Sequence, residues 1–531
     1  MERLHPDTLT RALPAVSRPA YDRDALHIGI VHLGLGAFAR AHLAPVNEAA
    51  MVHASDWRWG ICGVSPRQPD TRDALAPQDG LYTLAIRDAD AAGAKREQLA
   101  VIGALRETLV APDDPGRVLT RIAAPDTRIV SLTVTEKGYC HHPATGALNA
   151  DHPDVVHDLA HPQSPRSILG FIVYGLQQRH AANASPLTLM SLDNLPSNGK
   201  LLRGLVLDFA GRVDPGLQAW IATTCTFPCS MVDRIVPRTT DADRESISRA
   251  IGLDDAWPVL GEPFLDWVIE DDFAAGRPEW SAAGARFVGD ATPYEVLKLR
   301  MVNGTHSALA YLSVLAGWRT VDQAIAQPAI HRYLGTLMRN EIAPTLPALD
   351  GLDLAQYAER LLARFANPAL QHQTRQIAMD GSQKLPQRLL GTIRERLRDD
   401  LPIDGLALAV AAWLVYLQGR DEAREPYAIS DPLADALKGE VLAAVAAREA
   451  ATDSAHRGVA DVADIPSVAR AADVADAADV AYVAQLTGYR PVFGDLGGND
   501  RFVKTVAAQV KQLRTIGVAA TLAKRGTASA V

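Results

Sequence analysis

The apolar residues in the first half of the chain come in short continuous runs that predict buried strands. The first run covers residues 27–33, His-Ile-Gly-Ile-Val-His-Leu, and a glycine-bearing turn and a helical stretch to about residue 52 follow it. Further runs cover 59–64, 128–135 and 186–192. Continuous apolar runs are typical of strands covered on both faces of a parallel sheet, and their alternation with helical segments predicts an α/β fold.

The pattern changes at about residue 290 to long amphipathic segments rich in Ala, Leu and Arg. Segments such as 354–365 and 403–418 predict a mainly α-helical second half. At its start, Thr292-Pro-Tyr-Glu295 has the form of a capping box, so we expect an α-helix to begin at Thr292 and to include His306. An alanine-rich stretch at about 447–481 predicts either a surface helix or a loose insertion.

Length, charge and cysteine content narrow the classes of function. The 531 residues suffice for two or more domains, and the formal net charge of -9 argues against nucleic acid as a partner. The longest apolar run, at about 406–417, is too short to cross a bilayer, and the first seven residues hold no apolar stretch. We therefore expect a cytoplasmic protein that binds neither nucleic acid nor membranes.

The four cysteines are few for a chain of this length. Cys62, Cys140, Cys225 and Cys229 do not make a disulfide framework. The Cys225/Cys229 pair also lacks the second pair that a structural zinc site needs. We expect no metal.

The turn after the first predicted strand has the spacing of a dinucleotide-binding loop. Gly34-x-Gly36-x-x-Ala39 follows a strand and opens a helix, so backbone amides, including those of Ala37 and Phe38, can approach a pyrophosphate. Glycines also serve tight turns for steric reasons alone, and it is the setting between strand and helix that favours a cofactor. The fold context therefore predicts a dinucleotide site.

Two residues after the second predicted strand bear on which dinucleotide is bound. Asp70 is the nearest acidic residue that could repel a 2'-phosphate, and Arg67 is the nearest cation that could accept one. We expect NAD, with NADP as the alternative.

Candidate site residues follow three of the predicted strands and share one expected location. Gly34, Glu136 and Asn194 each come at a strand end. Ligands of open parallel sheets bind beyond the carboxyl ends of the strands, so we expect these residues at one crevice.

The predicted helix that begins at Thr292 carries an amine, an amide and an imidazole. At about 100° per residue, Asn303 lies roughly 140° from Lys298 and His306 roughly 80°, so the three fall on one broad face. The alternative without function is a solvated lysine and a hydrogen-bonded core histidine.

Five separated segments make the chain similar to the mannitol dehydrogenase family of polyol-specific long-chain dehydrogenases/reductases. They are residues 30–38, 131–139, 191–196, 226–237 and the Lys298 helix. The resemblance implies a Rossmann-type dinucleotide-binding domain over 1–290 and a mainly α-helical substrate-binding domain over 291–531. It further implies NAD(H) or NADP(H) as cofactor and metal-free hydride transfer at a secondary CH–OH group of a sugar acid or polyol.

The family's site residues carry over to named positions of this chain. The resemblance implies that Lys298 is the general base, that Asn194 and Asn303 flank the reacting oxygen, and that His306 positions the substrate. An uncharged amine can remove the proton of the alcohol, and desolvation lowers the pKa of an amine, while two amides can stabilise alkoxide character.

Three further positions match the family less securely. Glu136 matches a glutamate near the site, and Asp233 and Lys384 match substrate-side positions. For Asp233 the alternative is a structural ion pair with Arg234, and for Lys384 it is an exposed loop lysine.

Different segments of the chain resemble enzymes of the family that act on different substrates. Gln376 stands where bacterial mannitol 2-dehydrogenases carry an arginine, and residues 133–140 and 376–388 are more similar to the fructuronate (mannonate) oxidoreductases. A hexonate carries a carboxylate, for which Lys137, Arg300 and Lys384 are available cations. We expect NAD-dependent interconversion of D-fructuronate and D-mannonate.

Several alternatives to this function stay open or are disfavoured. Residues 192–196 and 254–258 are closer to the mannitol enzymes, so mannitol 2-dehydrogenase or another polyol or hexonate dehydrogenase is the alternative. A dinucleotide sensor without chemistry could lack Lys298 or Asn194, and both are present. A metal-dependent alcohol dehydrogenase needs a Cys/His ligand set that the sequence does not offer.

Overall fold

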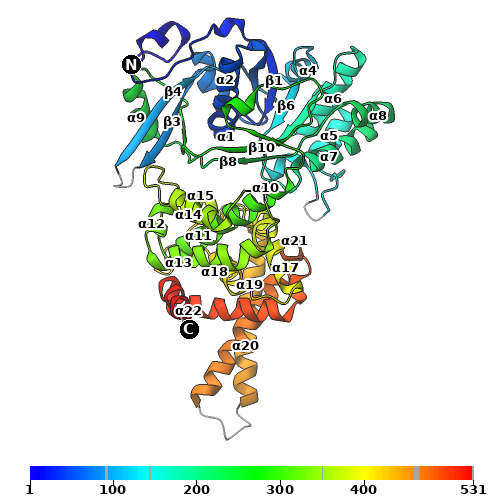
Figure 1. The fold of residues 1–531 in the computed structure, drawn as a ribbon. Coiled ribbons are helices and arrows are strands. Elements are labelled where there is room, and N and C mark those ends of the chain that lie inside the picture. The colour runs from blue at the N-terminus through cyan, green and yellow to red at the C-terminus, as the bar shows by residue number, and fades with distance from the viewer. Residues whose placement is uncertain (90–93, 143–144, 350, 460–466, 529–531) are drawn as a thin grey trace. The chain divides into compact units, whose positions relative to one another are not determined.

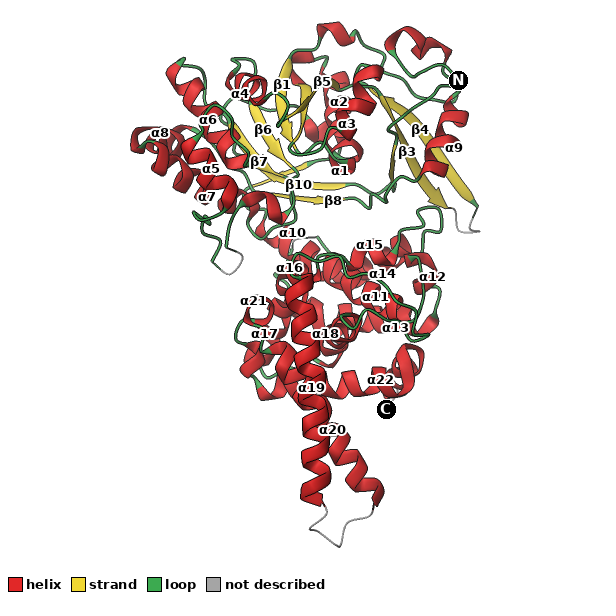
Figure 2. Ribbon diagram, turned by 180° about the vertical axis from the view of Figure 1, so that it is seen from behind, coloured by secondary structure: helices red, strands yellow, loops and turns green. Residues whose placement is uncertain are grey.

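The computed structural model describes residues 1–89, 94–142, 145–349, 351–459 and 467–528 of the chain. It divides into two compact units, Met1–Glu295 and Val296–Val531. Within the described residues every strand belongs to the first unit, and the second is helical (Figures 1 and 2). The predicted α/β fold with a mainly α-helical second part is confirmed.

A five-stranded parallel sheet in the order β5-β2-β1-β6-β7 forms the centre of the first unit. Its strands are β1 (Ile28–Leu33), β2 (Gly60–Ser65), β5 (Leu105–Val110), β6 (Ile129–Leu132) and β7 (Thr188–Ser191). In register, Leu33 pairs with Leu132, and Leu132 pairs with Ser191, so these three strands end side by side. The strand order reverses between β1 and β6, which is the switch point where ligands of such sheets bind.

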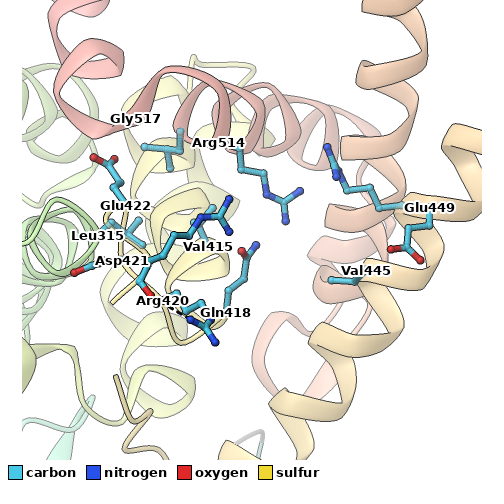
Figure 3. A pocket seen from close by; sticks show the side chains of 13 residues that line it. Leu315, Val415, Gln418, Arg420, Asp421, Glu422, Val445, Glu449, Arg514 and Gly517 are labelled. Atoms are coloured by element: carbon cyan, nitrogen blue, oxygen red, sulfur yellow. Dashed lines mark hydrogen bonds between the residues drawn. The ribbon is translucent and has the colours of Figure 1, made fainter. Parts of the chain in front are cut away.

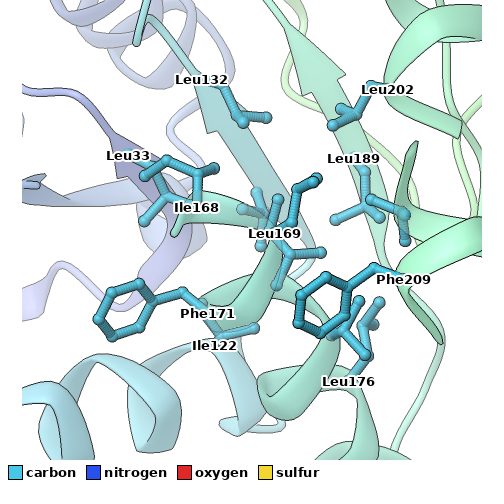
Figure 4. Packing of buried hydrophobic residues seen from close by; sticks show 14 of the residues in the cluster. Leu33, Ile122, Leu132, Ile168, Leu169, Phe171, Leu176, Leu189, Leu202 and Phe209 are labelled. Carbon is cyan, nitrogen blue, oxygen red and sulfur yellow. The ribbon is translucent and has the colours of Figure 1, made fainter. Parts of the chain in front are cut away.

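Helices cover both faces of this sheet, which explains why its strands β1, β2, β6 and β7 are buried almost throughout. Val31 and Leu33 belong to a buried cluster that also takes side chains from α4 (Pro115–Ala123), α6 (Ile168–Ala181) and α7 (Asn198–Val213), part of which Figure 4 shows. Ile30 points the other way, into a cluster that includes residues of α2 (Leu43–Ala54). Successive residues of one strand therefore serve two cores.

Two small sheets of the first unit were not predicted. One has the order β4-β3-β9 and the other the order β11-β10-β8. Their strands are β3 (Tyr82–Ala89), β4 (Lys95–Ile102), β8 (Ser230–Asp233), β9 (Val259–Gly261), β10 (Asp266–Glu270) and β11 (Arg286–Val288). They are short or carry charged residues, as the exposed start of β4 does, so no apolar run marks them. The remaining helices of this unit are α1 (Ala37–Ala41), α3 (Asp70–Leu75), α5 (Pro153–Ala160), α8 (Pro215–Thr224) and α9 (Asp241–Ile251).

The second unit is built around α18 (Asp404–Tyr416). Residues 406–414 of this helix are at most 1% exposed, because α11 (Thr305–Leu315) and α22 (Asp500–Ala528) pack against it. The other helices are α12 (Val321–Ile325), α13 (Pro328–Thr336), α14 (Leu354–Phe365), α15 (Thr374–Ala378), α16 (Gly381–Leu385), α17 (Gly391–Arg398) and α21 (Arg490–Phe493).

The alanine-rich stretch is helical where it is described. Its parts 447–459 and 467–481 lie in α19 (Ala434–Val459) and α20 (Ser467–Thr487), and 460–466 fall outside the described residues. The two helices lie side by side and extend away from the rest of their unit (Figures 1 and 2).

The predicted capping box at Thr292 is wrong, although a helix does begin there. The backbone N–H of Thr292 donates to Oδ1 of Asp290 at 2.9 Å, and Oε1 of Glu295 accepts from the backbone N–H of Ser197 at 2.7 Å. Asp290, two residues before Thr292, therefore accepts the hydrogen bond from the Thr292 backbone N–H that we expected Glu295 to accept.

Candidate functional site

The glycine turn after β1 has the conformation that a dinucleotide-binding loop requires. Gly34 has a φ of +101°, and a Cβ on it would lie 2.1 Å from the carbonyl oxygen of Thr133, so only glycine fits. Gly36 precedes α1, and no side chain caps that helix, so the amides of Ala37 and Phe38 have no acceptor within it. The predicted loop residues thus form a cradle that fits a pyrophosphate.

A buried histidine fixes this turn to the neighbouring strand. Nδ1 of His32 lies 2.9 Å from Oγ of Ser131, and Nε2 lies 2.8 Å from Oγ1 of Thr133. The Thr133 hydroxyl donates in turn to the carbonyl oxygen of Gly34 at 2.7 Å. Burial lowers the pKa of His32 to about 4, so the imidazole is neutral in the folded chain at neutral pH.

Acid should destabilise the protein through His32. The pKa of this histidine is about 4 when folded and about 6.5 in an unfolded chain. Between these values the unfolded chain binds a proton that the folded chain does not, so the free energy of unfolding falls as the pH drops through this window, by on the order of 3 kcal/mol.

A His32→Asn variant tests this prediction. We expect it to be less stable than the wild type at pH 7 but to lose less stability between pH 6.5 and about 4, measured by urea denaturation. Equal pH slopes for the two proteins would contradict this account.

The segment that carries Glu136 is fastened to the end of β7. The carboxylate of Asp193 accepts hydrogen bonds from the backbone N–H groups of Val134 and Thr135, each at 3.0 Å, and from the Tyr139 hydroxyl at 2.8 Å. Burial raises the pKa of Asp193 to about 6 despite these donors. This network brings the turn η5 (Glu136–Tyr139) beside the loop that begins with Asn194.

Within the first unit, three predicted site residues therefore come from neighbouring strand ends. Gly34, Glu136 and Asn194 follow β1, β6 and β7, which adjoin in the sheet. Asn194 is exposed and Glu136 is half-buried. The loop of Asn194 is further fixed by Asn198, whose Nδ2 donates to the carbonyl oxygens of Ser191 and Asp193.

A cavity of about 530 Å³ lies next to the ends of β2 and β5 and suits the adenosine end of a dinucleotide. Its lining includes Pro66, Arg67, Pro112 and Asp154. Nη2 of Arg67 lies 3.4 Å from Oδ2 of Asp154 in an exposed ion pair. Asp70 is exposed and opens α3, directly after this segment. Both residues predicted to bear on cofactor choice thus follow β2, and Arg67 is partly engaged by a carboxylate.

The predicted helix face of the second unit is reshaped by a π-helical segment. After α10 (Thr292–Leu297), residues Lys298–Gly304 form η7, and the α-helix resumes as α11. A Cβ on Gly304 would lie 2.7 Å from the carbonyl oxygen of Arg388, in another π-helical segment, η10 (Pro386–Leu390), so the two backbones are in close contact. Hydrogen bonding from i to i+5 brings Lys298 and Asn303 closer to one face than the α-helical spacing predicted.

The predicted amine, amide and imidazole, on η7 and the first turn of α11, are buried. Lys298 is 5%, Asn303 7% and His306 9% exposed. Nδ2 of Asn303 and Nε2 of His306 are inaccessible to solvent and have no hydrogen-bond partner among the described residues. Native proteins satisfy most buried polar atoms, so such atoms indicate a ligand site. The alternative of a solvated Lys298 and a hydrogen-bonded core histidine does not fit these environments.

His306 lies between two rings. It stacks on Phe365 with ring centroids 4.6 Å apart, and it meets His372 edge to face at 5.3 Å. Burial holds the pKa of His306 well below its usual value, and the charges of Arg388, Arg364 and Lys384 lower it further. Three cationic side chains therefore lie within electrostatic reach of this neutral imidazole.

The other predicted substrate residues have diverse environments. Arg300 makes two hydrogen bonds to the Glu395 carboxylate, at 2.6 and 2.5 Å, and a further one to the Thr345 carbonyl, so its charge is compensated within its own unit. Lys384 lies in α16, not in an exposed loop, and its Nζ donates to the Ile377 carbonyl at 3.4 Å. Asp233 is buried at the end of β8.

The guanidinium of Arg234 binds backbone carbonyl oxygens. It donates to the carbonyl oxygens of Glu262 at 2.9 Å and Ala41 at 2.6 Å. These bonds connect the segment after β8 to the last residue of α1.

Two titratable residues near the predicted site, Glu295 and His372, were not predicted as site residues. Glu295 has one carboxylate oxygen on the Ser197 amide and one without a hydrogen-bond partner among the described residues, and burial raises its pKa to about 7. His372 contacts His306. The spacing of Glu295, three residues before Lys298, could have indicated the first, whereas no local pattern marks the second.

A further cavity in the second unit, of about 560 Å³, carries balanced charge. Arg420, Glu422, Glu449 and Arg514 are among its lining residues (Figure 3). Arg514 and Arg448, which also lines it, each lie 3.0 Å from the same oxygen of Asp479. Acidic and basic side chains offset one another here, and the cavity points to no particular ligand.

Two kinds of site are not found in the described part of the chain. No group of three or more His, Cys, Asp or Glu side chains there is arranged to hold a metal ion. Nor does any helix among those residues combine the length and the apolar character needed to cross a membrane.

Comparison with known proteins identifies relatives of both units. The family descriptions "Mannitol dehydrogenase Rossmann domain" and "Mannitol dehydrogenase C-terminal domain" match residues 28–282 and 290–514. The D-mannonate oxidoreductase of Escherichia coli is 44% identical over 423 residues, 79% of this chain and 86% of that protein. A mannitol dehydrogenase of Saccharomyces cerevisiae is 42% identical over 424 residues, covering 79% and 84%.

A solved structure agrees over nearly the full length. The mannitol 2-dehydrogenase of Pseudomonas fluorescens, in a ternary complex with NAD and D-mannitol, matches with a TM-score of 0.87 and 36% identity, covering 99% of both chains.

Proposed function

Because the chain belongs to the mannitol dehydrogenase family, we propose that it interconverts D-fructuronate and D-mannonate with NAD(H). It is an NAD-dependent oxidoreductase that acts on a secondary CH–OH group. The choice of a hexonate, and the roles of individual residues, are the parts that we propose.

The first unit provides the features that suit the dinucleotide. The Gly34–Gly36 turn and the uncapped start of α1 supply backbone N–H groups for a pyrophosphate, and the cavity beside Arg67 suits the adenosine. When bound, the nicotinamide accepts or supplies the hydride. Asp70 supports NAD over NADP, because its carboxylate opposes a 2'-phosphate.

The proposed roles in proton transfer follow from the chemistry of each group. Lys298 takes the proton of the alcohol onto Nζ as the C–H bond gives up its hydride, and returns it in the reverse reaction. Asn303 has a buried Nδ2 without a partner among the described residues, which suits a donor to developing alkoxide charge. From the first unit, Asn194 supplies a second amide, Glu136 lies on the cofactor side and Asp233 contributes a carboxylate for substrate hydroxyls.

One observation carries the choice of a sugar acid: the positive surroundings of His306. Arg388, Arg364 and Lys384 all depress the pKa of this buried imidazole. A carboxylate gains from such surroundings, whereas an uncharged polyol gains little. Arg300 is left out of this proposal because Glu395 already compensates it. Relatives named for mannonate and for mannitol are similarly close, so our proposal of a sugar acid rests on the charge around His306.

Steady-state assays of the purified protein test this proposal. With NADH, we expect kcat/KM for D-fructuronate to exceed that for D-fructose by about 100-fold, because a buried charge-assisted hydrogen bond contributes about 1.5–3 kcal/mol. Tagaturonate serves as the comparison acid, and NADPH as the comparison cofactor. A preference for fructose would overturn the choice of substrate.

The second candidate is a mannitol 2-dehydrogenase. The structural neighbour with D-mannitol bound favours it, since its fold agrees over nearly the whole chain. The same assay separates the two candidates.

A cytoplasmic location is also part of our proposal, because all four cysteines are free, as is typical of reducing compartments.

A further inference from the structure

His372 is a second imidazole in the helical unit, half-buried as a residue, and the mechanism above gives it no role. Its ring lies 5.3 Å from that of His306, at an interplanar angle of 70°. Its Nδ1 atom is inaccessible to solvent and has no hydrogen-bond partner among the described residues. Nε2 of His306 is in the same condition. Two neighbouring imidazoles thus each present one unsatisfied nitrogen.

The backbone at His372 is fixed by its neighbours. The carbonyl oxygen of His372 accepts a hydrogen bond from the backbone N–H of Val321 at 3.0 Å, and Gln373 forms an antiparallel bridge with Thr320. The next residue, Thr374, donates from its hydroxyl to the carbonyl oxygen of Trp318 at 2.9 Å. The imidazole therefore extends from an anchored segment.

Both imidazoles are neutral at physiological pH. Burial lowers the pKa of His372 to about 4, and the positive charge of Lys384 lowers it further. Lys384 also depresses the pKa of His306, together with His372, Arg388 and Arg364. A neutral imidazole has one N–H donor and one acceptor nitrogen, so either kind of partner could bind at Nδ1.

A hydroxyl group is the partner that suits both nitrogens. It can donate or accept, so it satisfies either tautomer, and it relieves the cost of about 1–3 kcal/mol that an unsatisfied buried polar atom carries. A sugar chain presents hydroxyls on consecutive carbons, whereas a cation would be repelled by the positive side chains nearby. The site therefore suits a polyhydroxy anion.

We propose that His372 binds a hydroxyl of the sugar chain through Nδ1, next to the group bound by His306. This inference rests on the proposed function, because it takes the substrate to be a sugar acid or polyol. It adds a substrate-binding residue that discriminates between hydroxylated and deoxygenated chains.

Two variants of one position separate hydrogen bonding from packing. His372→Leu removes the nitrogen, and His372→Asn keeps a polar atom close to the position of Nδ1. We expect His372→Leu to raise KM about tenfold with little change in kcat, since the contact exists in ground and transition states alike, and His372→Asn to restore most of the loss. His331→Leu, at an exposed histidine of α13, is the matched control.

Binding of D-mannonate to the protein–NADH complex, measured by calorimetry, tests the contact without turnover. We expect His372→Leu to weaken this Kd about tenfold, while the affinity for NADH stays at the wild-type value. If fructuronate is not a substrate, D-mannitol replaces mannonate in this measurement, and we expect the same tenfold weakening of its Kd in His372→Leu. An error in the choice of a sugar acid can therefore be told apart from an error in the role of His372. Unchanged KM and Kd in His372→Leu, or equal losses in the Leu and Asn variants, would overturn the inference, as would failure of both sugars to bind the wild type.

Discussion

Replacing Lys298 with alanine lowers kcat by about 10²- to 10⁴-fold in both directions of the reaction, while affinity for NADH is retained. The reason is that the alcohol proton loses its acceptor, whereas the dinucleotide features lie in the first unit. Single-turnover kinetics with excess enzyme measure the chemical step, and quenching of NADH fluorescence measures cofactor binding.

A second lysine provides the control for this experiment. Lys438 is exposed on α19, and Lys438→Ala should leave both quantities unchanged. If Lys298→Ala keeps near wild-type turnover, the assignment of Lys298 as base fails. If it loses NADH affinity as well, the loss of turnover reports on binding or folding and not on proton transfer.

Two alanine substitutions in one loop should both weaken NADH binding but should differ in their effect on folding. A Cβ on Gly34 would lie 2.1 Å from a backbone carbonyl oxygen at a positive φ, so Gly34→Ala should lower the free energy of unfolding by about 1–3 kcal/mol or more and abolish NADH binding. A Cβ on Gly36 would meet only the carbonyl oxygen of Gly34, at 3.8 Å, so Gly36→Ala should fold normally.

The Gly36→Ala variant is the informative one. If a pyrophosphate approaches this backbone, the added methyl group should weaken NADH binding at least tenfold although stability is unchanged, which thermal unfolding and fluorescence titration measure together. Wild-type NADH affinity in Gly36→Ala would place the cofactor elsewhere.

The fold was predictable where one physical signal dominated. The runs that form β1, β2 and β7 are mostly apolar because helices cover both faces of the sheet and bury these strands. The helix α14 was predicted with its observed bounds from its amphipathic repeat. The sheet β4-β3-β9 was missed, since the alternation within β4 is obscured by its charged, exposed first residues.

Errors at the functional helix have tertiary causes. The sequence of Thr292–Glu295 satisfies a capping box, but Glu295 is drawn to the Ser197 amide, and Asp290 caps in its place. The π-helical turn after Lys298 accompanies the close backbone contact between Gly304 and Arg388, two residues far apart in the chain. Local pattern cannot reveal either contact.

The residues of the candidate site also fall into two groups: those that local sequence patterns mark and those whose surroundings depend on distant segments. Gly34 and Asn194 were predicted because strand ends and motifs mark them. Lys298 was predicted because one helix carries an amine, an amide and an imidazole and resembles that of the family. The sequence predicted that Arg300 could bind a substrate carboxylate, but Arg300 is hydrogen-bonded to Glu395 of α17. His372 was identified as a candidate only from its contact with His306. The surroundings of Arg300 and His372 depend on contacts between segments that are far apart in the chain, and a local sequence pattern does not predict such contacts.

The fate of a labelled hydride tests the central claim most directly. Purified protein is incubated with D-fructuronate and NADH dideuterated at the nicotinamide carbon 4, and the product is analysed by mass spectrometry and NMR. We predict D-mannonate that carries one deuterium, bound at carbon 5. Unlabelled product, deuterium at another carbon, or turnover of fructose alone would contradict NAD-dependent reduction of fructuronate by this protein.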